Sequence, residues 1–351
     1  MAAGAKTIVI SDVHMSNGAK YSWFLPPSPG NVTAMLNNFR DDGSVEELVI
    51  LGDLFDLWLY PLNVVPSTIS QIIQANLLIT EALRRCVQNI PNMYYIAGNH
   101  DMGVQQDDLR PFDYDGKRIT LILPEDYNAN PKYQNLRHFE HGHAVDMFNA
   151  PDDSGDTIGG YPLGYFITRL IATAEDQSAV WQALKGLIEG HAATHKAMGP
   201  AAFAIPSLGS YLVETIITLL EKLAQVHDNT PIRFSEPGLD ERFTVGDIKN
   251  HYGSLSIRWL AQYLTEFPER MLVGFRSNGL NWYANKLLCE NRALKVMLMG
   301  HTHHAEPAVA PQGSRYFNDG CWCIPGALGH GDPTPSYVEI IGDSAKVIPW
   351  L

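Results

Sequence analysis

The sequence is short of three things: cysteine, long apolar runs and positive charge. Its four cysteines are too few for a disulfide framework and its first residues show no secretory signal pattern, so we expect reduced thiols and a cytoplasmic setting. The longest stretch without Asp, Glu, Lys or Arg runs between Asp56 and Glu81, and Pro61 and Pro66 break it, which is not typical of a membrane-spanning helix. With 25 Lys and Arg against 38 Asp and Glu, the net charge of −13 disfavours a broad nucleic-acid surface, so we expect no nucleic-acid partner.

The first half of the chain repeats one unit, an apolar strand that ends in polar residues. The runs TIVISD (7–12), LVILGD (48–53) and MYYIAGN (93–99) share this form. Between them, segments such as 68–88 carry apolar residues at helical spacing. Strands that alternate with helices predict a parallel sheet, and ligands bind such sheets at the carboxyl ends of the strands.

Two later strands end in histidines. LRHFEHGH (136–143) and KVMLMGHTHH (295–304) repeat the apolar form and then place imidazoles at the strand end. After them, we expect RYFNDGCW (315–322), SYVEII (336–341) and AKVIPWL (345–351) to be consecutive antiparallel strands of a second sheet that packs on the first.

The segment from about 146 to 285 carries helical stripes of apolar residues instead of strands. We interpret it as a helical cap inserted into a core made of residues 1–145 and 286–351. The alternative is that these helices extend the core or form a dimer face. The pattern predicts no particular oligomeric state.

The polar residues at the five strand ends form a candidate set of metal ligands. They comprise three oxygen side chains and four imidazoles: Asp12, His14, Asp53, Asn99, His141, His301 and His303. The carboxylate of Asp53 can bridge two cations, and the neutral amide of Asn99 limits the negative charge of the site. Mixed nitrogen and oxygen ligation suits Mn, Fe, Zn or Ni better than Mg or Ca, so we expect two divalent ions, with Mn the first choice.

Two divalent ions held about 3.5–4 Å apart have a known use in hydrolysis. They polarise a phosphoryl oxygen and acidify a bridging water, and the resulting hydroxide attacks phosphorus in line. The ions also supply the local positive charge that lets an acidic protein act on an acidic substrate.

Five short motifs follow one another, each at an expected strand end: D-x-H (12–14), GD (52–53), GNHD (98–101), HGH (141–143) and GHTH (300–303). This series resembles the calcineurin-like metallophosphoesterase superfamily over about residues 6–145 and 286–351. The resemblance implies an α/β fold, a four-layer α/β/β/α sandwich of two mixed sheets, and metal-dependent hydrolysis of a phosphoester or pyrophosphate bond.

The resemblance also implies a role for each site residue. One ion would be bound by Asp12, His14, Asp53 and His303. The other would be bound by Asp53, Asn99, His141 and His301. His100 would lie beside the substrate, as a general acid or as a stabiliser of pentacoordinate phosphorus, and Asp101 would orient His100.

Within the superfamily, GDLFDLW (52–58) and YFNDGCW (316–322) resemble the bacterial UDP-2,3-diacylglucosamine pyrophosphatase branch. We expect a small-molecule or lipid-linked substrate, a phosphodiester or pyrophosphate with a bulky organic group, with peripheral membrane contact through the cap left open. The alternatives are a UDP-2,3-diacylglucosamine-type pyrophosphatase, a hydrolase of phosphotriesters, phosphonates or non-phosphorus esters, and a binding protein without catalysis.

Five further residues lie close to the motifs in sequence. Asp56 is expected in a helix N-terminal turn, and His143 and His304 are expected beside the ligands and not among them. Cys321 and Cys323 are expected to be structural, because no second cysteine pair accompanies them to complete a zinc site.

Overall fold

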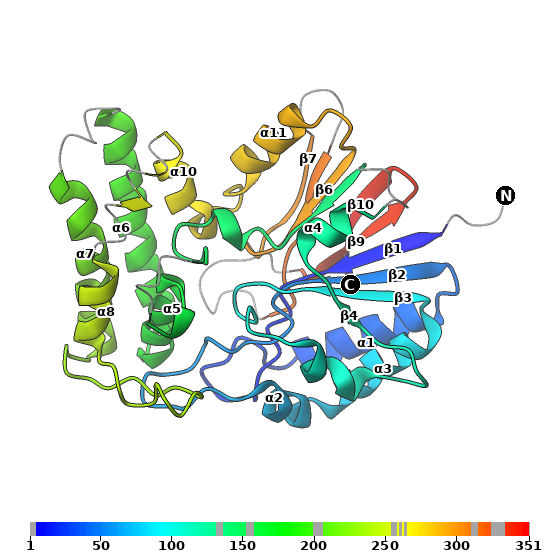
Figure 1. Ribbon diagram of the computed structural model, residues 1–351, viewed down its shortest axis with the longest axis horizontal. Coiled ribbons are helices and arrows are strands. Elements are labelled where there is room, and N and C mark those ends of the chain that lie inside the picture. The colour runs from blue at the N-terminus through cyan, green and yellow to red at the C-terminus, as the bar shows by residue number, and fades with distance from the viewer. Residues whose placement is uncertain are drawn as a thin grey trace.

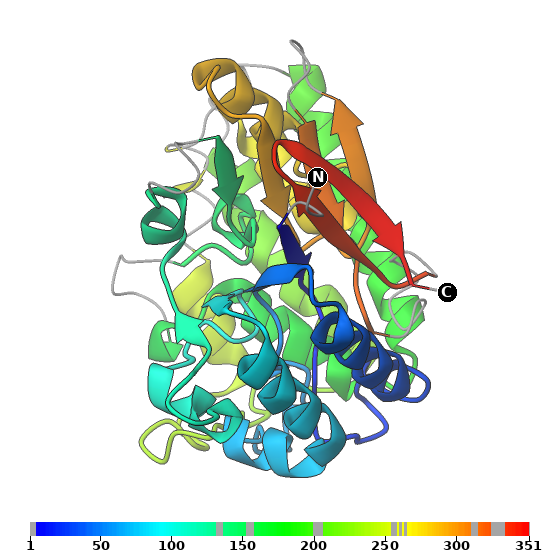
Figure 2. The same cartoon turned by 90° about the vertical axis from the view of Figure 1, so that its right-hand side faces the viewer.

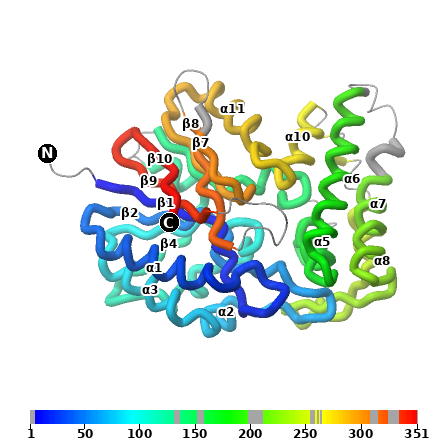
Figure 3. Tube along the Cα trace, turned by 180° about the vertical axis from the view of Figure 1, so that it is seen from behind, coloured from blue at the N-terminus to red at the C-terminus, as the bar shows by residue number. Residues whose placement is uncertain are grey.

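The computed structural model describes residues 5–130, 136–151, 158–198, 206–253, 258–259, 262, 265–309, 315–323 and 334–350. Two β-sheets lie on one side of the molecule, and a group of helices stands on the other (Figure 1). The view from behind shows the same division between the sheets and the helices α5 to α8 (Figure 3).

The first sheet has the strand order β10-β9-β1-β2-β3-β4. Its strands are β1 (Lys6–Ile10), β2 (Val45–Leu51), β3 (Asn92–Ile96), β4 (Thr120–Leu121), β9 (Ser336–Ile341) and β10 (Ser344–Pro349). Strands β1 to β4 pair in parallel, as the apolar runs at their positions predict. Strand β9 pairs antiparallel with β1, and β10 pairs antiparallel with β9.

The second sheet has the order β5-β6-β8-β7. Its strands are β5 (Arg137–Phe139), β6 (Val296–Met299), β7 (Ala305–Val309) and β8 (Arg315–Asp319). Strands β5, β6 and β8 pair in parallel, and β7 pairs antiparallel with β8.

The expected arrangement of the last three strands is wrong. Strand β8 lies in the second sheet but runs parallel to β6, whereas β9 and β10 form a hairpin that joins the first sheet beside β1 (Figure 2). The apolar residues of a strand identify its buried face and not its partner. Val338 and Ile340 of β9 pack between the two sheets, a position that a strand in either sheet can occupy.

The two sheets and their outer helices make four layers, which confirms the α/β sandwich. Because side chains alternate along β1, Val9 packs between the sheets while Ile8 and Ile10 pack against the helices outside. The first sheet is covered by α1 (Ser28–Asp41) and α3 (Leu77–Asn89). The second is covered by α11 (Asn281–Glu290). Two short helices and a 3-10 helix complete this part: α2 (Ile69–Ala75), α4 (Pro124–Asn128) and η1 (Gln106–Phe112).

Residues between β5 and α11 are mainly helical. Their helices are η3 (His143–Val145), η4 (Ile158–Gly160), α5 (Leu163–Thr173), α6 (Gln177–Met198), α7 (Pro206–Ala224), α8 (Val245–Tyr252), α10 (Phe267–Met271) and η6 (Val273–Phe275). Their buried faces form one apolar cluster that also includes Trp58 and Leu59, which follow β2. No helix in the described ranges combines the length and the apolar character that crossing a bilayer requires. The division of the chain into core and cap stays a prediction.

A buried arginine joins the helices to the loop after β2. Arg169 of α5 is fully buried, and its guanidinium donates hydrogen bonds to the hydroxyl of Tyr165 and to several backbone carbonyls. These carbonyls belong to Tyr60, Pro61, Val64 and Arg233. Because loop carbonyls have no ladder to satisfy them, one side chain with five donors stabilises the whole turn.

We expect Arg169→Met to destabilise the fold by about 3 kcal/mol or more, because each buried carbonyl left without a donor costs about 1–3 kcal/mol. The measurement is thermal unfolding, with an expected fall in midpoint of about 5 °C or more. The matched control is Arg85→Met, since Arg85 is 52% exposed in a surface pair with Glu81 and its loss should change stability by no more than about 0.5 kcal/mol. Equal shifts for the two variants would contradict the role of Arg169.

Candidate metal centre

The seven residues expected as ligands come together where strands of both sheets end. Asp12 and His14 follow β1, Asp53 follows β2 and Asn99 follows β3. The remaining three come from the second sheet: His141 after β5, and His301 and His303 after β6. All seven are at most 9% exposed. Residues up to 291 positions apart therefore share one buried volume, as the convergence of strand ends predicts.

Asp53 lies between His14 and His141, which belong to two groups of potential ligands. On one side, the Nε2 atoms of His14 and His303 are 3.0 Å apart, and Asp12 Oδ1 lies 3.4 Å from His303 Nε2. On the other side, Asp53 Oδ2 lies 3.2 Å from His141 Nε2, and the same oxygen is 3.7 Å from His14 Nε2. The ligand atoms of Asp12, His14 and His303, and those of Asp12, Asp53 and His141, form two groups in which all atoms lie within 4.8 Å.

Some buried atoms of this centre lack the hydrogen bonds that a folded protein normally provides. Asn99 Oδ1 is buried and makes no hydrogen bond with any described residue, and His141 Nε2 makes none either but lies 3.2 Å from Asp53 Oδ2 and 3.9 Å from Asp12 Oδ1. Such an atom costs about 1–3 kcal/mol unless something else pairs with it. A cation is the partner that suits an amide oxygen and an imidazole nitrogen together, so the residues present fit a metal centre.

The backbone of the centre is strained. Asp12, His14, Asp53, His301 and His303 all have φ between 51° and 69°, in the left-handed region. Asp and His enter this region more readily than most residues, but each still costs about 1 kcal/mol or more. Five left-handed residues at one site indicate a geometry that is held for function.

Two glycines let the strand ends approach one another. A Cβ on Gly98 would overlap the side chain of Asp53, and a Cβ on Gly300 would overlap Ser11 and Asp12. The glycines of the motifs GNHD and GHTH are therefore required by the close packing of ligand-bearing loops.

The charges of the centre are strongly coupled. Burial alone would raise the pKa of Asp12, but the charge of His141 and hydrogen bonds from His14 and His303 lower it well below its usual range. Burial alone would lower the pKa of His141, but the charges of Asp53 and Asp12 raise it to about 10. Asp12 and Asp53 are therefore expected to be anionic. Their charge is balanced by histidines, since no described Lys or Arg pairs with either carboxylate.

Asp146, which the sequence did not identify, holds His301. It is fully buried, and its Oδ2 lies 2.9 Å from His301 Nε2. The amide of Asn149 and the backbone N–H of Phe148 donate to the same carboxylate. A carboxylate that fixes one nitrogen of an imidazole leaves the other for a metal, and this pairing is common in metal sites. Its only sequence signal is a lone Asp three residues after HGH.

Asp56 also has a contact that the sequence analysis missed. Its Oδ1 accepts the backbone N–H groups of Trp58 and Leu59 in a turn, but the expected helix N-terminal turn is wrong, because the next helix, α2, begins only at Ile69. The same carboxylate lies 3.0 Å from His100 Nδ1 and 3.6 Å from His14 Nδ1. Burial would raise the pKa of Asp56, but its two histidine neighbours lower it far below the usual range. Asp56 therefore orients His100, the expected substrate-side histidine, and its charge lies near His14.

Asp101 does not have the contact expected for it. Its Oδ1 accepts the backbone N–H of Gly98 at 2.8 Å, and its Oδ2 accepts the N–H of Phe55 and the hydroxyl of Tyr95. Burial and the charge of Asp53 raise the pKa of Asp101 to about 6. Asp101 thus fixes the loops that carry the ligands, while the contact to His100 belongs to Asp56.

Ser11 links Asp12 to a second buried acid. Its hydroxyl contacts Asp12 Oδ2 and also Asp319 Oδ1, the latter at 2.7 Å. One hydroxyl hydrogen cannot serve two carboxylates, so the geometry needs one more proton. Burial and the charge of Asp12 raise the pKa of Asp319 to about 8, which makes Asp319 the group that holds it.

His143 and His304 lie beside the centre in sequence and differ from the ligands in surroundings. The His143 ring is 5.5 Å from that of His141, and burial with the charges of His141 and His301 lowers its pKa to about 3. His304 is half-buried. Neither belongs to the groups of residues that could share an ion in the described part of the chain.

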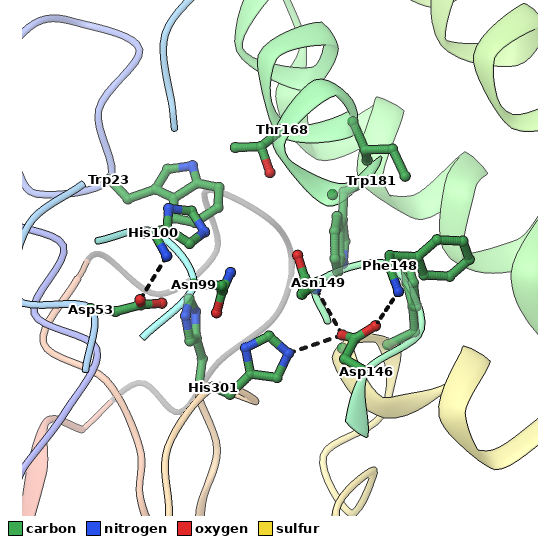
Figure 4. A pocket seen from close by; sticks show the side chains of 15 residues that line it. Trp23, Asp53, Asn99, His100, Asp146, Phe148, Asn149, Thr168, Trp181 and His301 are labelled. Carbon is green, nitrogen blue, oxygen red and sulfur yellow. Dashed lines mark hydrogen bonds and ion pairs between the residues drawn. The ribbon is translucent and has the colours of Figure 1, made fainter. Parts of the chain in front are cut away.

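A cavity of about 80 Å³ opens beside the centre. Asp53, Asn99, His100 and His301 lie on one side of it, and Phe148, Asn149, Thr168 and Trp181 lie on the other (Figure 4). Trp23, Ile167 and Phe275 complete much of its apolar wall. Because one water needs about 10–15 Å³ of such space, the cavity accommodates a group of several non-hydrogen atoms.

Two mixed sheets that gather buried carboxylates, an amide and imidazoles at their strand ends define a metal-dependent phosphoesterase. The chain belongs to the calcineurin-like phosphoesterase family, whose model matches residues 5–196, more than half of its length. The family implies a dinuclear centre of divalent ions, and the Asp and His groups described above fit it.

Comparison with solved structures finds similarity to a dimetal phosphatase from Danio rerio. The two chains are 9% identical, 99% of each is covered, and the TM-score is 0.35, a likeness on which we base no argument. No curated protein matches the sequence.

We expect Asp53→Ala to reduce the metal content of the purified protein to one ion per chain or less, because this carboxylate lies near both His14 and His141, which are expected to bind different ions. The measurement is elemental analysis after dialysis against Mn²⁺, with circular dichroism to confirm folding. The control is Asp107→Ala, whose carboxylate is 73% exposed beside Arg110 and should leave the content unchanged. A variant at Asp53 that still holds two ions would show that Asp53 is not the shared ligand.

Proposed function

We propose that this phosphoesterase hydrolyses phosphodiesters that carry a compact apolar group, preferably an aromatic one. The observation that carries the proposal is the lining of the cavity beside the metal centre. Four of its side chains are aromatic, and none of the described residues that line it is Lys or Arg. The aromatic four are Trp23, Phe148, Trp181 and Phe275.

The charge of the lining favours a diester over a more highly charged substrate. A monoester dianion or a pyrophosphate carries charge on oxygens that cannot all reach the ions, and such oxygens are usually bound by Arg or Lys. Here the cavity has the buried carboxylate of Asp146 in its wall instead. A diester carries a single negative charge, so the ions alone can balance it.

The aromatic wall suits the organic group of the ester. Trp181 of α6 and Phe275 of η6 stack at 4.9 Å with 16° between their planes. Phe148 meets the edge of Phe275 at 6.0 Å. These residues come from the segment 146–285, so we infer that this segment acts as a cap that selects the substituent on phosphorus.

In the proposed reaction the seven expected ligands bind the ions, and His100 donates a proton. Asp12, His14, Asp53 and His303 would bind one ion, and Asp53, Asn99, His141 and His301 the other. When bound, the ions, for which we favour Mn²⁺, polarise the phosphoryl group and activate water. Asp56 holds His100 Nδ1 at 3.0 Å, which leaves Nε2 as the nitrogen that can give a proton to the leaving oxygen.

The alternatives differ in what the cavity would have to bind. A UDP-2,3-diacylglucosamine-type pyrophosphatase needs cationic contacts for a second phosphate and room for two acyl chains, for which the described lining offers little support. A phosphotriester, phosphonate or carboxylic ester suits the uncharged aromatic wall and is the second candidate. A binding protein without catalysis is disfavoured because all seven expected ligands converge.

A substrate panel, of which four members share the p-nitrophenolate leaving group, tests the proposal. The Mn²⁺-loaded protein is assayed with p-nitrophenyl phosphate, methyl p-nitrophenyl phosphate, bis(p-nitrophenyl) phosphate, a diethyl p-nitrophenyl triester and a UDP-linked lipid. We expect kcat/KM to be highest for the bis-aryl diester, by at least about tenfold over the monoester, which corresponds to about 1.4 kcal/mol. Preference for the monoester or for the UDP-lipid would reject the substrate class.

His100→Ala should retain both ions but lose turnover by roughly 10²–10⁴-fold, as expected for removal of a general acid. His100 also lies within 4.8 Å of ligand atoms of His14 and Asp53, so metal ligation is the competing role. Metal content and kcat measured on the same preparation separate the two roles. Loss of an ion from the variant would make His100 a ligand.

Trp181→Ala should lower kcat/KM for the bis-aryl diester about tenfold and change that for the methyl aryl diester much less. The reason is that an aromatic contact is worth about 0.5–1.5 kcal/mol beyond its area burial. Trp282→Ala is the control, because Trp282 belongs to α11 and packs against the apolar cluster of that helix and against Arg270, outside the cavity lining. Equal losses for both diesters would mean that Trp181 does not contact the second substituent.

A further inference from the structure

A pair of thiols lies against the metal centre and takes no part in the proposed reaction. Cys321 and Cys323 follow β8, are free, and are 2% and 5% exposed. Their sulfur atoms and a ring nitrogen of His303 all lie within 4.8 Å of one another. Two sulfurs and an imidazole nitrogen at this separation form a potential ligand set that is distinct in chemistry from the carboxylate and imidazole set beside it.

The thiol segment is fixed to the centre by the backbone. The N–H of Trp322, between the two cysteines, donates to the carbonyl oxygen of Asp12 at 3.0 Å. His303 is the shared residue, since its Nε2 is also 3.0 Å from His14 Nε2 and 3.4 Å from Asp12 Oδ1. An ion at the thiols would therefore be a neighbour of the catalytic ions.

The chemistry of the three groups selects the kind of ion. Thiolate and imidazole ligands suit Zn²⁺ and other thiophilic ions, whereas Mn²⁺ and Mg²⁺ favour oxygen ligands. The two cysteines are spaced by one residue, and His303 adds a third ligand from elsewhere in the fold. Each sulfur would release its proton to solvent as its bond to the ion forms.

We propose that His303, Cys321 and Cys323 form an inhibitory binding site for a thiophilic divalent ion, Zn²⁺ or its spectroscopic analogue Cd²⁺. An ion bound there competes with the catalytic centre for His303, because a neutral imidazole has one nitrogen lone pair and therefore binds one ion. The enzyme would thus be active with Mn²⁺ and switched off by Zn²⁺ through its cysteines. The inhibitory step rests on the proposed dinuclear hydrolase, and the presence of the sulfur site does not.

The test uses the full-length protein loaded with Mn²⁺, kept reduced with a phosphine and carrying Cys289→Ser to remove the exposed thiol. Cd²⁺ is titrated while the ultraviolet sulfur-to-cadmium band and hydrolysis of bis(p-nitrophenyl) phosphate are followed. We expect the band to saturate at about one equivalent while activity falls in parallel. X-ray absorption at the cadmium edge should find two sulfur neighbours.

The decisive variant adds Cys321→Ser and Cys323→Ser to this background. It should keep its Mn²⁺-dependent activity, lose the band, and need at least about tenfold more Cd²⁺ for half-inhibition, a shift of about 1.4 kcal/mol. The matched control is Cys86→Ser. It alters a buried thiol that donates a hydrogen bond to the Leu36 carbonyl, and this variant should keep the band. If the double variant does not fold, the X-ray absorption of the parent protein decides by itself.

Each contrary outcome has one meaning. Cadmium without sulfur neighbours overturns the proposal even if activity falls, since the ion then replaces Mn²⁺ in the catalytic centre. Sulfur ligation with unchanged hydrolysis overturns the competition for His303. A sulfur-bound ion in a protein that hydrolyses no ester of the panel would instead reject the proposed function and leave the thiol site standing.

Discussion

The structure depends on two carboxylates, Asp12 and Asp53, that are buried among histidines without a Lys or Arg to pair with them in the described part of the chain. A buried anion is tolerated only when hydrogen bonds and opposite charge compensate it. The surrounding imidazoles can supply positive charge only by binding protons, and their nitrogens then repel one another. Divalent cations resolve the conflict, because they neutralise the carboxylates and let the imidazoles act as neutral ligands.

The sequence predicts the parts of this site that are local. An apolar strand followed by a polar residue identifies both the strand and the ligand at its end, which is why all seven expected ligands converge. Asp146 and Asp56 could not be found in this way, because what matters is which imidazole each carboxylate reaches across the fold. The pairing of β9 with β1 could not be predicted for a related reason. The alternation of apolar residues along a strand identifies its buried face but not the strand beside it.

The two facing sheets make the strained centre possible. Left-handed residues at the ends of β1, β2 and β6 would relax in a mobile loop, but here each follows a strand that is buried on both faces. Gly98 and Gly300 remove the Cβ atoms that would keep these loops apart. The rigidity of the sheets is thereby transferred to the ligands, which is the condition for holding two ions at a fixed separation.

Two kinds of side chain surround the metal centre: the aromatic residues of the cavity wall and the thiols of Cys321 and Cys323. In the function that we propose, the aromatic side chains from residues 146–285 leave the charge of the substrate to the ions and select the organic group by its shape. The thiols of Cys321 and Cys323 lie beside His303, and thiol ligands favour soft, thiophilic ions. The imidazole of His303 belongs to both ligand sets, and its nitrogen accepts hard and soft cations alike. The identity of the metal is therefore controlled by what stands around His303: carboxylates on one side and sulfur on the other.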